Sequence, residues 1–156
     1  MSYYIALSLL LIFYILYSWY WQATIVMKAR FRSSNVVWAA IFLLVGLGAG
    51  FFDLHAQGLS LLLASFLVAS LLDGQSGFGE KRVVLSGYFK RTLAYSEIAE
   101  VKLVKAPADM PLVVAILQTK NRQQYALRFS KKAEAVMSQL RNKLQSGVKI
   151  EVESMV

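Results

Sequence analysis

The chain has 156 residues, of which 57% are hydrophobic, and it carries a net charge of +8. This composition is too apolar for an ordinary soluble domain of that length. Because the chain contains no cysteine, disulfide bonds, thiolate nucleophiles and cysteine-ligated zinc or iron–sulfur centres are excluded.

The apolar residues are concentrated in the first 72 positions. The charged residues there are Lys28, Arg30, Arg32 and Asp53. They leave three charge-free runs, at 1–27, 33–52 and 54–72. Apolar runs of about 18 residues or more predict membrane spans. We therefore expect residues 1–72 to form a membrane domain of three transmembrane helices, at about 3–27, 36–52 and 54–72.

The loop after the first predicted span indicates the orientation of the chain. Aromatic residues near the end of this span, which suit the headgroup level, are Tyr17, Trp19, Tyr20 and Trp21. Three cations follow at positions 28–32 without an acid, and such loops stay cytoplasmic. The sequence thus predicts a multi-pass plasma-membrane protein with its N-terminus outside. The chain start lacks the positive region of a secretory signal, so we expect this span to be retained.

Small residues in the second and third predicted spans would let helix backbones approach closely. These helix-packing candidates are Gly46, Gly50, Ser60 and Ala64. They predict packing within a hairpin or, alternatively, a homodimer face through Gly46 and Gly50. The intervening polar turn contains Asp53 and His55, which could solvate helix ends or relay protons. Full crossing and a re-entrant hairpin both remain compatible with the sequence.

The three glycines in residues 73–79 predict a flexible linker to a basic domain at residues 80–156. Alternating or β-rich runs predict short strands, at 81–86, 91–95, 99–105, 112–119 and 123–129. An apolar stripe predicts a helix at about 131–145, and alternation at 148–152 predicts a further strand. We expect a small α+β domain with the helix packed on the sheet.

Three short segments of this domain, together with the helix, carry a recognisable pattern. They are RVVLSG at 82–87, RTLAYSEIAEV at 91–101 and YALRF at 125–129. The pattern resembles the pleckstrin-homology-like domains of small bacterial membrane proteins and covers about residues 79–146. The resemblance implies an antiparallel sheet or partial barrel closed by a C-terminal amphipathic helix. The chain offers fewer strands before the helix than that family has.

Basic and aromatic side chains of this domain form the predicted binding surface. They are Lys81, Arg82, Tyr88, Phe89, Lys90, Arg91, Lys102 and Lys105. They would contact a protein partner or the anionic leaflet, where each cation contributes about 1 kcal/mol, or would merely solvate a cytosolic surface. The cations lack the spacing of phosphoinositide-binding members of the family, so specific headgroup recognition is not expected.

The sequence argues against an enzyme. It has one histidine, no metal-ligand spacing, no nucleophile–base–acid set and no glycine-rich phosphate loop between a strand and a helix. No cofactor and no metal are expected, and no nucleic-acid motif accompanies the basic charge. Two functions remain: a membrane-anchored module that binds a protein or the lipid surface, and an accessory subunit of a larger membrane complex. Membrane lipids and either a protein partner or a second copy of the chain are the expected partners.

Overall fold

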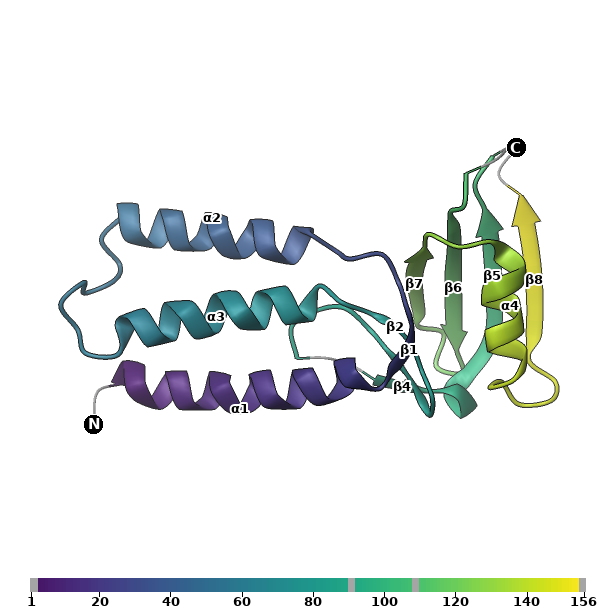
Figure 1. The fold of residues 1–156 in the computed structure, drawn as a ribbon, viewed down its shortest axis with the longest axis horizontal. Coiled ribbons are helices and arrows are strands. Elements are labelled where there is room, and N and C mark those ends of the chain that lie inside the picture. Colours follow the sequence, from purple (N-terminus) through teal and green to yellow (C-terminus); the bar gives the residue numbers. More distant parts are fainter. Residues whose placement is uncertain (1–2, 90–91, 108–109, 155–156) are drawn as a thin grey trace. The chain divides into compact units, whose positions relative to one another are not determined.

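The computed structural model describes residues 3–89, 92–107 and 110–154 (Figure 1). The described chain divides into two compact units. The helical unit comprises residues 3–23, 31–75 and 86–89. The β unit comprises residues 24–30, 76–85, 92–107 and 110–154.

The helical unit is built from three apolar helices. They are α1 (Tyr3–Ala23), α2 (Ser34–Gly48) and α3 (Leu59–Asp73). Both α1 and α2 pack against α3, which lies between them in Figure 1.

The prediction of three transmembrane helices is wrong. Among the described residues, only α1, with 21 residues, is long and apolar enough to cross a membrane. The helices α2 and α3 have 15 residues each, or about 22 Å of length, whereas a hydrocarbon core is about 30 Å thick.

The charge-free runs overestimate the helices because they include turn residues. Gly50 and Gly58 adopt positive φ angles of 71° and 89°, which glycine tolerates and a helix does not. Residues 49–58, most of which were assigned to the predicted spans, therefore form the loop between α2 and α3. At the end of α1, Thr24, Ile25 and Val26 are β-branched residues that favour an extended backbone, and the helix ends at Ala23.

The described β unit contains two four-stranded sheets. Sheet A has the order β1 (Ile25–Lys28), β2 (Gly77–Gly79), β3 (Arg82–Val84) and β4 (Thr92–Ala94). Sheet B has the order β7 (Gln124–Phe129), β6 (Val113–Thr119), β5 (Ile98–Lys105) and β8 (Lys149–Ser154). The 3-10 turn η1 (Tyr95–Glu97) leads from β4 into β5.

Most strands of the β unit were predicted, but their arrangement differs from the expected one. The runs at 81–86, 91–95, 99–105, 112–119 and 123–129 overlap β3 to β7. The helix and the final strand are confirmed as α4 (Ala133–Arg141) and β8. However, β8 pairs parallel with β5, and α4 lies before it rather than closing an antiparallel sheet. A parallel neighbour requires a crossover connection, which α4 supplies between β7 and β8. The α+β class is retained.

The core of the β unit lies on one face of sheet B. Phe78 of β2 stacks on Phe129 of β7, with ring centroids 4.7 Å apart, so sheet A covers part of this face. The fully buried Val136 and Leu140 of α4 belong to the same cluster, and Figure 1 shows α4 over β5 and β8, running roughly along the strands. The opposite face of sheet B is left half-exposed.

Two of the three glycines expected to form a flexible linker instead lie in a paired strand, and the third, Gly74, caps α3. Gly77 and Gly79 belong to β2, which pairs with β1 and β3. A Cβ atom on Gly77 would lie 2.7 Å from Ile25 Cγ2 and closer still to the carbonyl oxygen of Met27. A Cβ atom on Gly79 would lie 2.7 Å from the carbonyl oxygen of Arg82. Glycine is therefore needed because neighbouring backbones approach closely.

Replacing Gly77 with alanine should destabilise the protein by about 1–3 kcal/mol, because the added methyl group must push β1 away from β2. The control is Gly48→Ala in α2, where a Cβ atom would meet nothing within 4 Å and where alanine favours the helix. Thermal unfolding of the detergent-solubilised chain measures both. An unchanged unfolding temperature for Gly77→Ala would mean that the segment behaves as a linker after all.

Candidate functional site

The helical unit buries small or polar side chains and exposes large apolar ones. The buried residues of α1 are Ser8 and Ser18. In α2 and α3 most buried residues are also small or polar, and the two buried leucines are Leu43 and Leu59. Among the exposed residues, Leu10 of α1 is 65% exposed and Trp38 of α2 is 67% exposed. This pattern is the reverse of that in a helical bundle surrounded by water.

Asp73, the last residue of α3, is fully buried and joins several elements of the helical unit. Its Oδ2 accepts the Tyr14 hydroxyl at 2.6 Å, and its Oδ1 accepts the Ser18 hydroxyl at 3.2 Å. Tyr14 and Ser18 are four residues apart and thus share one face of α1. The Asp73 carbonyl accepts the Gly87 N–H at 3.0 Å and the Asn35 side-chain amide at 3.4 Å. One residue therefore links all three helices and the loop after β3.

The predicted aromatic pair, Tyr88 and Phe89, belongs to the helical unit. The Tyr88 ring stacks on Phe66 of α3 with centroids 6.2 Å apart, and its hydroxyl lies 3.1 Å from Ser70 Oγ. Phe89 is 81% exposed and adopts a φ of 56°, a conformation that is strained for a bulky residue. The loop thus holds the Tyr88 ring against α3, while the largely exposed Phe89 ring has its centroid 5.5 Å from that of Tyr14 in α1.

The predicted cations that the structure describes are divided between the two sheets. Lys81 is exposed just before β3, while Arg82 lies within β3 and its Nε is buried without a hydrogen-bond partner among the described residues. Lys102 and Lys105 lie on β5 of sheet B. Lys102 Nζ is 3.6 Å from Glu151, which offsets its charge. The remaining two predicted cations, Lys90 and Arg91, lie outside the described residues.

The predicted helix-packing residues are not brought together. Gly46 is buried, and a Cβ atom there would lie 2.9 Å from Phe52 Cζ. Gly50 lies in the turn after α2, whereas Ser60 and Ala64 are exposed on α3.

The polar turn between α2 and α3 is stabilised by a local hydrogen bond. Asp53 Oδ1 accepts the backbone N–H of His55 at 3.1 Å, which is an Asx turn. Both residues are exposed. No group of three potential metal ligands occurs in the described part of the chain.

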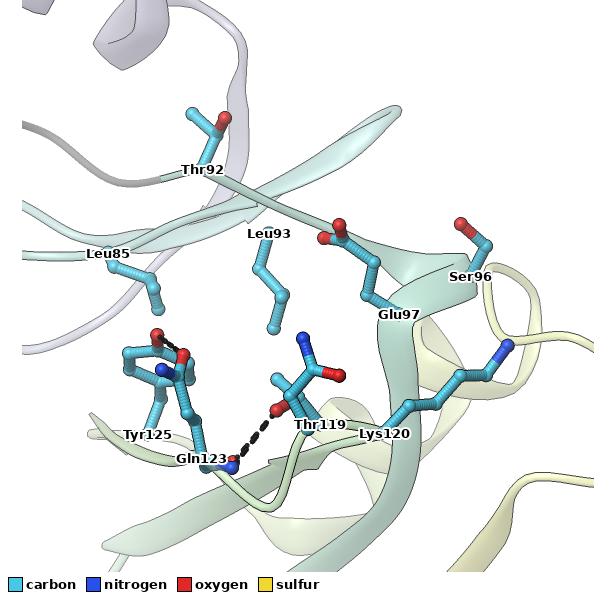
Figure 2. Close-up of a pocket in the computed structure, with 10 residues that line it drawn as sticks. Leu85, Thr92, Leu93, Ser96, Glu97, Thr119, Lys120, Gln123 and Tyr125 are labelled. Atoms are coloured by element: carbon cyan, nitrogen blue, oxygen red, sulfur yellow. Dashed lines mark hydrogen bonds between the residues drawn. The ribbon is translucent and has the colours of Figure 1, made fainter.

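A cavity of about 590 Å³ lies in the β unit, where sheet A, η1 and the β6–β7 hairpin meet (Figure 2). We call it the η1 cavity. It is lined by Leu85, Thr92, Leu93, Ser96, Glu97, Thr119, Lys120, Asn121, Gln123 and Tyr125. Its volume falls within the range of about 300–1,000 Å³ that is typical of ligand sites.

Local hydrogen bonds hold the walls of the η1 cavity. Glu97 Oε2 accepts the Ala94 N–H at 2.9 Å, which fixes η1. The Lys120 N–H donates to the Glu97 carbonyl at 3.0 Å, so the β6–β7 hairpin is attached to η1. The Gln123 N–H donates to Thr119 Oγ1 at 3.1 Å within the hairpin turn.

The lining of the η1 cavity is part apolar and part polar. Figure 2 shows Leu85 and Leu93 projecting towards the hairpin side chains, so the cavity has an apolar side. Tyr125 donates its hydroxyl to Gln123 Oε1 at 2.8 Å on the opposite side. Hydroxyl, amide, carboxylate and ammonium groups form the rest of the lining. Sequence reasoning missed this site because its residues come from separate turns and strand ends, which showed only turn signals.

A buried hydrogen-bonded group adjoins η1. The Gly79 carbonyl accepts the Tyr95 hydroxyl and the Lys143 ammonium group, each at 2.7 Å. Burial raises the pKa of Tyr95, so its hydroxyl remains protonated and can donate across the neutral pH range. This contact connects η1 and the chain after α4 to β2.

No family model, curated protein or solved structure matches this chain. The pleckstrin-homology-like resemblance therefore stays a prediction, and the site is interpreted from its own geometry.

Replacing Tyr14 with phenylalanine should lower stability by about 1–3 kcal/mol, because it removes a donor to a buried carboxylate. The control, Tyr17→Phe, changes an exposed tyrosine of the same helix and should have almost no effect. Thermal unfolding of Asp73→Asn with and without Tyr14→Phe completes a double-mutant cycle. Additive effects in that cycle would contradict a direct contribution of the hydrogen bond.

Proposed function

We propose that this chain is a membrane-anchored binding protein. Its helical unit is held in a lipid bilayer through α1, and its β unit binds a partner protein. The observation that carries the proposal is the reversed burial of the helical unit: mostly serine, alanine, glycine and an aspartate inside, and most leucine and aromatic residues outside. Helices in lipid pack through small and polar residues because their large apolar side chains already have a favourable environment.

Long apolar helices also occur in the cores of soluble proteins and in secretory signals, but α1 fits both roles less well. The core helix of a soluble protein is mostly buried, whereas only 11% of the apolar stretch of α1 is buried. A secretory signal is removed, yet Tyr14 and Ser18 of α1 donate to Asp73, and Gln22 donates to the carbonyl of Leu72. Removal of α1 would take these donors away from the remaining fold.

The basic residues between α1 and α2 support a cytoplasmic β unit. Lys28, Arg30 and Arg32 occur there without an intervening acid, and short basic segments next to spans remain on the cytoplasmic side. Lys28 and Arg30 lie in the β unit itself. We therefore place the β unit, with its η1 cavity, on that side.

A protein partner fits the β unit better than an anionic lipid surface. Of the cations predicted to bind, those that the structure describes are divided between two sheets, and Lys102 is paired with Glu151. By contrast, the η1 cavity combines apolar side chains with hydrogen-bonding groups, as the cores and rims of protein interfaces do. The proposal therefore assigns recognition to the η1 cavity.

The membrane part of the proposal predicts that the intact chain resists alkaline extraction from membranes. Leu10→Arg places a charge on the exposed face of α1 and should reduce the membrane-integrated fraction, since arginine at a span centre costs about 2.5–3.5 kcal/mol. Leu10→Ala, which keeps the face uncharged, is the matched control. Release of the unmodified chain into the alkaline supernatant would refute a membrane anchor.

The binding part of the proposal predicts position-specific crosslinking. A photoreactive phenylalanine derivative at Asn121, on the η1 cavity, should yield one discrete protein adduct in native membranes, and Lys120→Glu should abolish it. The same probe at Asn142, an exposed residue after α4, should give no such adduct. An identical set of adducts at both positions, or none at Asn121, would count against partner recognition by this cavity.

A further inference from the structure

We propose that two copies of this chain associate through the outer edge of β8. The two sheets B would then join as antiparallel neighbours around a twofold axis.

The outer edge of β8 is open. Sheet B ends at β8, which pairs only with β5 among the described residues, and Figure 1 shows it as the last strand of the sheet. Such an edge presents backbone N–H and C=O groups that can accept another strand. The opposite edge, β7, differs because the Arg30 N–H donates to the Arg128 carbonyl there at 2.6 Å.

The side chains of β8 alternate between two faces. Glu151 is in register with Lys102 and lies 3.6 Å from it on the outer face of sheet B. Lys149 also pairs with Glu151, so these charges share one face. Ile150 packs against the core cluster, and Val152 has the same orientation by alternation.

These faces restrict how a second β8 can pair. In an antiparallel pair, directly opposed residues lie on the same face, so a shift by one residue would oppose apolar and charged side chains. The faces match only when the twofold axis passes beside a residue, so that this residue lies opposite the same residue of the second copy. Each possible register can therefore be named by its central residue.

The charges then select one register. Centring on Lys149 opposes two lysines, and centring on Val152 opposes Glu151 to Glu153. Centring on Glu151 sets Lys149 opposite Glu153 but also opposes the two Glu151 side chains directly. Centring on Ile150 places Lys149 opposite Glu151 of the second copy, twice, and opposes no like charges. Among the registers centred on a β8 residue, this one alone combines opposed unlike charges with no opposed like charges.

Apolar surface favours the same register. A cavity of about 270 Å³ adjoins the start of β8 and is lined by Leu144, Val148 and Ile150 together with Arg141, Gln145 and Ser146. Val152, at the other end of β8, is 44% exposed. With Ile150 facing its own copy, Val152 of each chain lies opposite Val148 of the other, beside this cavity. The exposed valine and the open cavity thus complement each other, and the twofold arrangement closes at a dimer.

The absence of cysteine from the chain permits a clean test by single-cysteine crosslinking of the full-length protein in proteoliposomes. Cysteine is introduced singly at positions 149 to 153, and oxidation traps neighbouring copies. Directly opposed residues have Cα atoms about 4.5–5.5 Å apart, within the range of a disulfide. Crosslinking should therefore be highest for Ile150→Cys. A uniform yield, or a maximum at another position, would overturn the proposal.

Charge variants test the same interface without relying on cysteine. Lys149→Glu places a glutamate opposite Glu151 of the other copy at both ends of the pair. This change should lower the dimer fraction by about tenfold, as measured by native mass analysis in lipid nanodiscs. Lys131→Glu makes the same charge change at an exposed position outside β8 and should leave the dimer unchanged. Glu153→Lys should also leave it unchanged, since residue 153 faces Gly147 in this register. A monomeric unmodified chain, or a dimer insensitive to Lys149→Glu, would refute the interface.

Discussion

The pairing of β1 with β2 is the contact on which the β unit depends. It brings Met27 and Phe78 into the core, and the ring of Phe78 stacks on Phe129 of sheet B. Without this pairing, sheet A would lose its edge strand β1, and the core would lose Met27. The pairing is possible because Gly77 and Gly79 have no side chains where neighbouring backbones approach. The small size of these glycines therefore permits the pairing that places Phe78 against sheet B.

The helical unit follows a different principle. Its helices keep most large apolar side chains outside and bury mainly small and polar groups. Asp73 is the clearest example, because its carboxylate and carbonyl together accept donors from α1, α2 and the loop after β3. A buried carboxylate is costly unless such donors are present. The two units therefore place their apolar residues oppositely, inside the β unit and outside the helical unit.

Periodic segments were predictable from the sequence, whereas long-range contacts were not. The alternation in β6 and β7 and the apolar stripe of α4 are local patterns, and they identified these elements correctly. The strand β1 was hidden at the end of an apolar run, although its β-branched residues were a usable signal. Asp73 looked like a linker residue because its donors Tyr14 and Ser18 are 59 and 55 residues away. The η1 cavity was equally hidden, since no single motif contains its residues.

The position of β1 in the chain has a consequence for biosynthesis. Its partner β2 follows only after α2 and α3, so a nascent polypeptide emerging from the ribosome cannot close sheet A until that helical hairpin has been translated. Closing so long a loop is also slow compared with forming a local hairpin. During this interval Ile25 and Met27 are not paired with Gly79 and Phe78. The unpaired segment can then be bound by chaperones or can aggregate. Sheet A can therefore form only after α2 and α3 have been synthesised.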